Sequence, residues 1–209
     1  MTDEFKEFQQ DIEASFFNYA HLTGAVETYI LLLETPSLQR SFSKTMGGDE
    51  TDWKTIHRFM DLGNQRVVWY PQLPIKEIVQ QKNSIIGMLY GVFISRMIAA
   101  VDYYLTFVLK NRYGHSEKSG SSWEAFCQKT KIDLLSRKNG PQVYQFLQER
   151  HKIEHNKAQI DQTFVDRLMK KGITHSYTAG DSIQKSHLDV LATHNAIKEF
   201  VSDVDSLIK

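Results

Sequence analysis

The feature that most constrains the fold is a long stretch in which apolar residues recur every three or four positions. Between residues 75 and 110, the residues with this spacing are Ile86, Leu89, Phe93, Met97, Val101, Tyr104 and Val108. Such spacing places the side chains on one face of an α-helix. The flanking faces are also apolar, and a helix that is apolar nearly all round belongs at the centre of a protein. Because Arg96 and Asp102 interrupt the stretch, we expect a buried central helix rather than a membrane span.

The rest of the chain predicts further helices around this one. Apolar residues from Phe5 to Leu33 keep helical spacing until Pro36 ends the pattern. Further helices are expected over residues 52–62, 122–135, 141–155, 161–170 and 187–208, with capping boxes at residues 121–124 and 186–189 and a proline start at residue 141. No segment alternates apolar and polar residues as a half-buried strand does. The sequence therefore predicts a single all-α domain over residues 1–209, a bundle of about six to eight helices.

Composition and single residues narrow the class of protein. Twenty-five basic and twenty-five acidic residues cancel, so any contact with nucleic acid depends on a local patch of charge. The single Cys127 cannot form an intrachain disulfide and is expected to be a packed thiol. His194, on the apolar side of the last helix, is expected to be a core residue whose hydrogen bonds are satisfied. The N-terminus is acidic where a signal peptide is basic and then apolar, so we expect a cytoplasmic protein.

The most informative motif is Arg150-His151-Lys152-Ile153-Glu154-His155-Asn156, at the end of the helix expected over residues 141–155. A guanidinium offers a planar set of donors that suits a phosphate, and a histidine can take or give a proton near neutral pH. Phosphodiester cleavage without a metal needs these two functions. Five residues span about 7.5 Å of helix, so the arginine must reach along the axis to meet the imidazole.

Arginine, four residues and then histidine, at the end of a helix in an all-α protein, resemble the signature of the HEPN superfamily (higher eukaryotes and prokaryotes nucleotide-binding domain). The wider pattern from Glu149 to Asn156, with Ile160-Asp161 and Phe164 after it, is similar to that of bacterial HEPN proteins. The resemblance extends over about residues 84–208 and implies a HEPN-like core with extra N-terminal helices. It implies an endoribonuclease that needs neither metal nor cofactor, with two motifs meeting across a homodimer. It further implies a role in stress response, toxin–antitoxin systems or phage defence, with an antitoxin as one kind of partner.

The resemblance also implies a role for each motif residue. Arg150 would bind the scissile phosphate and stabilise charge in the transition state, and His155 would act as general base or acid on the 2′-hydroxyl or the leaving oxygen. His151 stands where the family more often has asparagine and would orient a motif side chain or the phosphate. Asn156 and Glu154 would support the site. The residues expected to contact the RNA backbone are Lys152, Lys157, Arg167, Lys170 and Lys171.

Other interpretations of the same residues stay open. Residues 151–155 have the sequence H-x-x-E-H, which is the inverted zinc-protease motif. Zinc needs a third protein ligand, however, and the only glutamate after the motif is Glu199 in the last helix. A metal-carboxylate bundle would need histidine three residues after the glutamate, where Lys157 stands. Arg150 and His155 could also do no more than cap the end of a solvated helix. The remaining alternative is a non-catalytic HEPN-like module that binds nucleotide, RNA or a partner protein.

Overall fold

The computed structural model describes residues 1–35, 37, 38, 41, 55–61, 66–74, 79–115, 122–155 and 158–208, with the backbone alone for residues 33, 55–61, 66–74 and 155. In chain order the elements are α1 (Asp3–Glu34), β1 (Thr55–Asp61), β2 (Arg66–Pro74), α4 (Lys82–Tyr113), α5 (Ser122–Thr130), the 3-10 helix η1 (Leu134–Ser136), α6 (Gly140–His155), α7 (Gln162–Lys170) and α8 (His187–Asp205). The fold is all-helical, as the sequence predicts, apart from one small hairpin.

Most helix boundaries agree with the sequence signals. The capping box at the start of α8 is confirmed, because the Ser186 hydroxyl accepts the Asp189 amide while the Asp189 carboxylate accepts the Ser186 amide. Asp161 caps α7 by accepting the amide of Phe164. The helix that carries the motif ends at His155, where the sequence places its end. The other capping box begins at residue 121, which lies outside the described residues.

The helix expected over residues 52–62 is wrong, because β1 covers Thr55–Asp61 and pairs antiparallel with β2. The expectation that no sheet forms is wrong for the same two segments. The β2 sequence Arg-Val-Val-Trp-Tyr is rich in β-branched and aromatic residues, which favour strands. A Gly63-Asn64 pair stands between the two segments, and such pairs are typical of hairpin turns. These two signals outweigh the weak helical spacing of the first segment.

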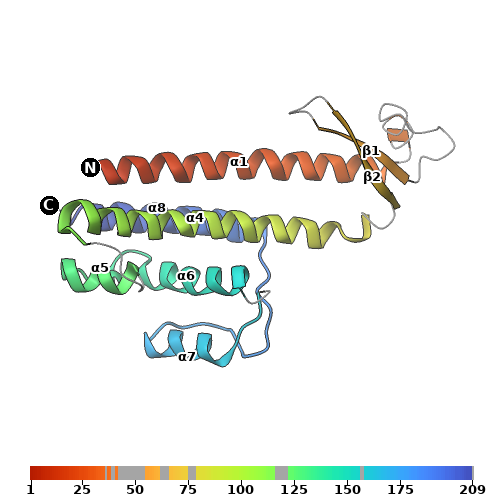
Figure 1. Cartoon of the computed structure of the whole chain (residues 1–209). Helices are drawn as coiled ribbons and strands as arrows, with labels where there is room; N and C mark the ends of the chain where they lie inside the picture. The colour runs from red at the N-terminus through yellow and green to blue at the C-terminus, as the bar shows by residue number, and fades with distance from the viewer. Residues whose placement is uncertain are drawn as a thin grey trace. The chain divides into compact units, whose positions relative to one another are not determined.

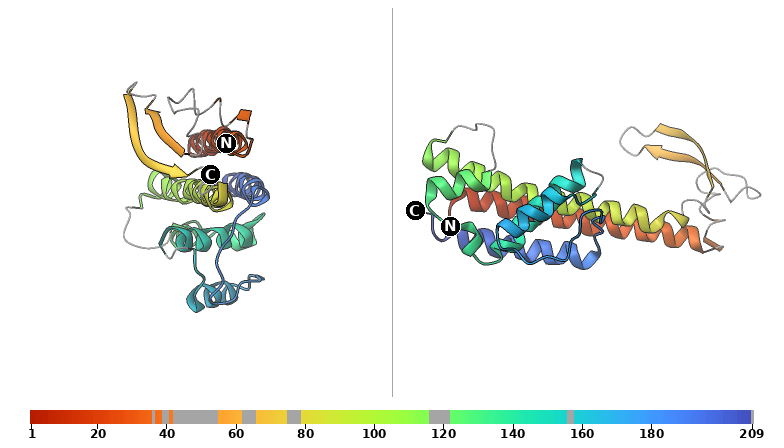
Figure 2. Two further views of the ribbon diagram at one scale, coloured as in Figure 1. Left: turned by 90° about the vertical axis from the view of Figure 1, so that its right-hand side faces the viewer. Right: turned by 90° about the horizontal axis from the view of Figure 1, so that it is seen from below.

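The chain forms two compact units, Met1–Tyr19 with Leu89–Lys209, and Ala20–Met88. In the first unit, α4 and α8 lie side by side, with the first turns of α1 on one side and α5 and α6 on the other (Figures 1 and 2). Helix α7 lies beyond α6 in the same views. The second unit contains the rest of α1, the hairpin and the first turns of α4, and Lys82 forms an ion pair with Glu34 there. That the chain is a single domain stays a prediction.

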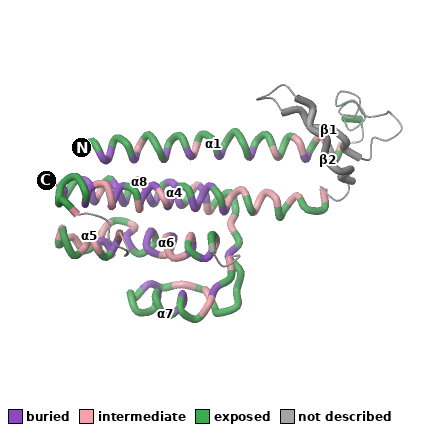
Figure 3. The backbone as a smooth tube through the Cα atoms, in the orientation of Figure 1, coloured by how far each residue is buried: buried purple, intermediate pink, exposed green. Residues whose placement is uncertain are grey.

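The core of the first unit is built on α4 and α8, where buried residues are densest (Figure 3). Trp123 from α5 stacks on Phe200 of α8 with ring centroids 5.4 Å apart and meets the Tyr144 ring edge-on. Among the described helices, α4 alone is long and apolar enough to cross a membrane by length and composition, and 44% of its most apolar window is buried. A core helix of a soluble protein meets the same criteria, so this observation is weak evidence for a membrane span.

A buried carboxylate ties helix ends together in the first unit. Asp205, at the end of α8, accepts hydrogen bonds from the Thr2 amide (3.1 Å), the Thr2 hydroxyl and the Tyr104 hydroxyl (3.2 Å). Thr2 and Asp205 are both buried. Burial, together with the nearby Asp205 carboxylate, raises the pKa of Tyr104 far above its usual range, so this hydroxyl stays protonated as a donor. The start of α1 and the end of α8 are therefore held at one point on α4.

His194 is a core residue, as predicted, but its hydrogen bonds are not satisfied. Its ring stacks on Phe16 of α1 with centroids 4.3 Å apart, and only 8% of the residue is exposed. Its Nε2 has no hydrogen-bond partner among the described residues, while Nδ1 lies 3.4 Å from the Asn195 side-chain oxygen. The charged groups near the ring are Glu13 on α1 and Lys198 on α8, which form an ion pair with each other. Burial lowers the pKa of His194 below its usual 6.5.

We expect His194 to make the protein less stable as the pH falls below about 6.5. The imidazole takes up a proton more readily in the unfolded chain, so protons shift the equilibrium toward unfolding between the unfolded pKa and the lower folded pKa. Urea unfolding at pH 7.5, 6.5 and 5.5 should give a smaller loss of stability in His194→Gln than in the wild type. His21→Gln is the control, because it removes an imidazole that is exposed and lies outside the core. Equal pH slopes for all three proteins would contradict the expectation.

Candidate functional site

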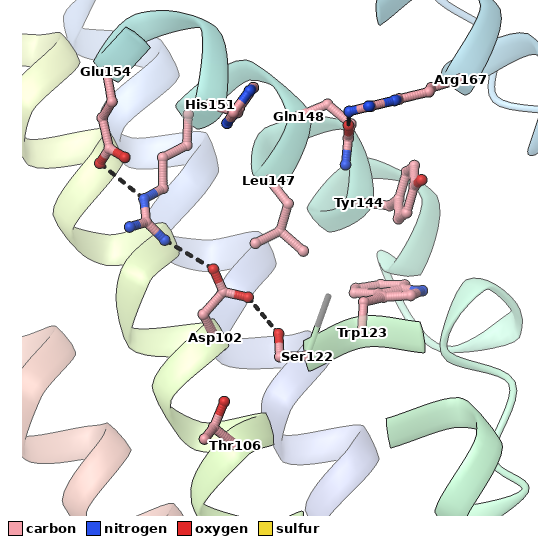
Figure 4. A pocket seen from close by; sticks show the side chains of 11 residues that line it. Asp102, Thr106, Ser122, Trp123, Tyr144, Leu147, Gln148, His151, Glu154 and Arg167 are labelled. Carbon is pink, nitrogen blue, oxygen red and sulfur yellow. Dashed lines mark hydrogen bonds and ion pairs between the residues drawn. The ribbon is translucent and has the colours of Figure 1, made fainter. Parts of the chain in front are cut away.

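The motif helix contributes to an open cleft of about 450 Å³ whose lining residues come from α4, α5, α6 and α7 (Figure 4). All four elements belong to the first compact unit. The lining residues are Asp102, Thr106, Ser122, Trp123, Tyr144, Leu147, Gln148, Arg150, His151, Glu154 and Arg167. Two carboxylates and two guanidinium groups are among them, so the formal charge of the lining cancels when His151 is neutral.

Arg150 is held between two carboxylates at one end of the cleft. Its Nη1 donates to Asp102 Oδ2 at 2.8 Å, and its Nε donates to Glu154 Oε1 at 2.9 Å. The second oxygen of Asp102 accepts the Ser122 hydroxyl at 2.6 Å, so this carboxylate links α4 to both α5 and α6. The three charged side chains remain 26% to 38% exposed, so solvent reaches this network.

The other end of the cleft is aromatic and carries the second cation. Figure 4 shows Tyr144 near Gln148 and Arg167, with Trp123 between Tyr144 and Ser122. Trp123 and Tyr144 are buried at 2% and 5% exposure, so they form the floor and wall rather than free stacking platforms. The Arg167 guanidinium is exposed and donates a long 3.4 Å hydrogen bond to Gln148. One end of the cleft is therefore ionic, and the other combines an aromatic wall with a cation.

Glu149 and Lys152, which flank Arg150 and His151 in the sequence, are not among the lining residues and fix the helix. Glu149 is fully buried and accepts hydrogen bonds from Lys185 Nζ (2.5 Å), the Tyr177 hydroxyl (2.6 Å) and Gln145 (2.8 Å). Lys152 is buried and donates to Asp161 at 2.5 Å, and this hydrogen bond lowers the pKa of the Asp161 carboxyl. Glu149 and Lys152 therefore anchor α6 to the segment before α8 and to the start of α7.

Ala158, the first described residue after α6, is held by backbone hydrogen bonds. Ala158 has a φ of +61°, in the left-handed region that side chains other than glycine seldom adopt. Its amide donates to the Lys152 carbonyl, and its carbonyl accepts the Ile183 amide. Gln159 forms an isolated antiparallel bridge with Ser182 next to these bonds. Ala158 is thus bonded both to the last turns of α6 and to the segment before α8.

The structure brings some of the predicted site residues together and separates others. Arg150, His151, Glu154 and Arg167 line the same cleft. Lys152 is buried in its ion pair with Asp161, and this removes its ammonium from the surface that RNA could touch. Lys171 lies 3.6 Å from Glu124 and 5.5 Å from the centre of the Tyr144 ring, and Lys170 is exposed, both outside the cleft lining.

Three predicted residues are not placed by the structure. The backbone of His155 forms the last residue of α6, but its side chain lies outside the described part of the chain, as do Asn156 and Lys157 altogether. The pairing of the Arg150 and His155 side chains therefore stays a prediction.

Sequence reasoning missed Asp102 and Ser122 as members of the site. In the sequence, Asp102 is a charged residue that interrupts an apolar helix, and nothing local assigns it to the site. A carboxylate in such a position needs a cationic or hydrogen-bonding partner, and that requirement is the signal from which a partner could have been sought. Ser122 stands in the start of a helix, where a serine is usually read as a cap. Its hydroxyl donates to Asp102 instead.

Within the described residues, no group of three or more histidine, cysteine, aspartate or glutamate side chains is placed to hold a metal ion. Comparison with protein-family models gave no match, and neither the curated proteins nor the solved structures gave a similar protein. That the chain is a HEPN protein therefore stays a prediction from its sequence motif.

Proposed function

We propose that the chain is a metal-independent endoribonuclease of the HEPN type that acts as a homodimer. The observation that carries the proposal is the cleft that Arg150, His151 and Arg167 line together. A solvent-accessible cleft with two guanidinium groups suits the phosphates of RNA. In this proposal Arg150 binds the scissile phosphate, and Asp102 is a positioning residue that directs the guanidinium into the cleft.

In the proposed reaction the ribose 2′-oxygen attacks the adjacent phosphorus atom. His155 takes the proton of the 2′-hydroxyl or gives one to the departing 5′-oxygen, and the His155 of a second subunit makes the other of these two transfers. Arg150 balances the charge that builds on the phosphate oxygens. The P–O5′ bond breaks as the P–O2′ bond forms, so the products are a 2′,3′-cyclic phosphate and a 5′-hydroxyl. A second subunit would bring its own motif to the same cleft. We place this activity in stress response, a toxin–antitoxin system or phage defence.

A second candidate is a non-catalytic module that binds nucleotide, RNA or a partner protein. One observation favours it: two carboxylates already occupy donors of Arg150, and an arginine in such ion pairs can serve structure alone. Both candidates use the same cleft, so the test must separate binding from cleavage.

The test is incubation of a mixed RNA pool with purified protein in excess chelator. We expect chelator-resistant cleavage by the wild type and a loss of about 1,000-fold or more in Arg150→Ala/His155→Ala, because a transition-state donor and an acid–base group are both removed. Arg96→Ala/His21→Ala is the matched control, since both residues are exposed and outside the cleft lining. RNA bound but not cleaved by the wild type would favour the second candidate, and cleavage retained in the motif variant would overturn the site.

A further inference from the structure

We propose that Glu154 competes with phosphate for Arg150, so that the cleft takes up a phosphate group by exchanging this carboxylate. The inference rests on the proposed function, because it assigns the phosphate of the ligand to Arg150. Glu154 thereby sets the affinity of the cleft for its ligand, which is a phosphodiester or free phosphate.

The two carboxylates on Arg150 are not held equally. Asp102 has a second hydrogen bond of 2.6 Å from Ser122, so three helices fix its position. Glu154 lies on the same helix as Arg150, one turn later, and Arg150 is its hydrogen-bond partner among the described residues. When a phosphate arrives, Glu154 is therefore the carboxylate that can leave with the smaller loss of contacts.

The position of Glu154 on α6 also weakens its hold. An arginine followed four residues later by a glutamate is the less favourable order for an ion pair on a helix. Glu154 is the residue before the last one of α6, where the partial negative charge of the helix end repels a carboxylate. Arg150 lies more than one turn before the end, so the charge of the helix end has little effect on it.

Departure of Glu154 opens the side of the guanidinium that binds phosphate best. Glu154 accepts from Nε, whereas Asp102 accepts from Nη1. The hydrogens on Nε and Nη2 point the same way and together can bind two oxygens of one phosphate. Asp102 can stay in place throughout, so Arg150 exchanges one anion for another without leaving its position.

The charges that line the cleft predict the size of the effect. Asp102 and Glu154 balance Arg150 and Arg167, so phosphate enters a cleft of zero formal charge. Glu154→Gln removes one negative charge and the competing contact, which leaves the lining at a formal charge of +1. We expect phosphate to bind about tenfold more tightly in this variant, a change equivalent to about 1.4 kcal/mol.

The experiment is a titration of wild-type protein and variants with inorganic phosphate, and in parallel with a short 2′-O-methyl RNA that cannot be cleaved at its phosphodiesters. Binding is followed through the Arg150 Nε–Hε signal in ¹H–¹⁵N spectra and by calorimetry. Glu124→Gln is the matched control, because Glu124 is exposed and lies outside the cleft lining, so the same change in net charge should alter Kd by less than about twofold. If Glu154→Gln lowers the Kd for inorganic phosphate alone, the site is assigned to free phosphate. If it lowers the Kd for both phosphate and the 2′-O-methyl RNA, the site is assigned to the RNA backbone.

A double-mutant cycle tests the competition itself. In Arg150→Gln, the further change Glu154→Gln should alter Kd by less than about twofold, because the group for which the anions compete is gone. The inference is overturned if Glu154→Gln does not tighten binding, or if it tightens binding equally with and without Arg150. Cleavage of natural RNA is measured separately. A protein that binds phosphate as expected but does not cleave RNA would refute the proposed ribonuclease activity and still support the exchange of Glu154 for phosphate at Arg150.

Discussion

Glu149→Ala is expected to lower the free energy of unfolding by about 3–5 kcal/mol. The Glu149 carboxylate is fully buried and pairs with the Lys185 ammonium, whose side chain is 7% exposed. Removal of the carboxylate leaves a buried positive charge without its counter-charge and takes the acceptor away from the Tyr177 hydroxyl. Urea unfolding followed by circular dichroism measures the loss.

Two comparisons make this expectation specific. Glu199→Ala removes an exposed glutamate that pairs with Lys138 at 3.3 Å, with both side chains at least half exposed, and should cost less than about 1 kcal/mol. Glu149→Leu/Lys185→Met replaces both charges with apolar groups and should recover most of the stability lost in Glu149→Ala. If Glu149→Ala costs no more than Glu199→Ala, the buried pair does not have the structural role assigned to it.

Gly140→Ala is expected to destabilise the protein by about 3 kcal/mol, because a side chain at this position overlaps the backbone. A Cβ atom on Gly140 would lie 2.1 Å from the Leu134 carbonyl oxygen and 3.0 Å from that of Leu135. Neither oxygen belongs to a flexible side chain, so η1 or the first turn of α6 must move to make room. Thermal and urea unfolding would both report the change.

Gly87→Ala is the control for the loss of glycine itself. Gly87 lies within α4, and a Cβ there has no neighbour within 4 Å. Alanine in a helix is more favourable than glycine by about 0.5–1 kcal/mol, so this variant should be slightly more stable than the wild type. The same chemical change should thus have opposite signs at the two positions. A tolerated Gly140→Ala would mean that the turn before α6 can relax.

The helices were predictable from the sequence where local signals agreed with the apolar pattern. The start of α8 shows this best, because Ser186 and Asp189 form a capping box beside a clear apolar stripe. The hairpin was missed because helical spacing in residues 52–62 was weighed above the β-forming residues of the following segment and the Gly63-Asn64 pair. The ends of strands depend on a partner segment, and that information is not local.

Three of the eleven residues that line the cleft belong to the motif, and the other eight could not be named from it. Arg150, His151 and Glu154 share one helix, so their proximity follows from the helical repeat. Asp102 comes from a segment 48 residues earlier, and only the packing of α6 on α4 brings it to Arg150. The burial of Lys152 beside Asp161 was equally hidden, because a lysine in a basic motif reads as a surface residue until the fold covers it.

The Asp205 carboxylate changes how the ends of the bundle can come undone. Helix ends ordinarily fray one by one, since each terminal turn is held by its own few bonds. Here the amide and hydroxyl of Thr2 and the hydroxyl of Tyr104 share one buried acceptor at the end of α8. Breaking any of these hydrogen bonds exposes the shared carboxylate to water and weakens the remaining bonds. The first turn of α1 and the last turn of α8 therefore open together, as one cooperative event.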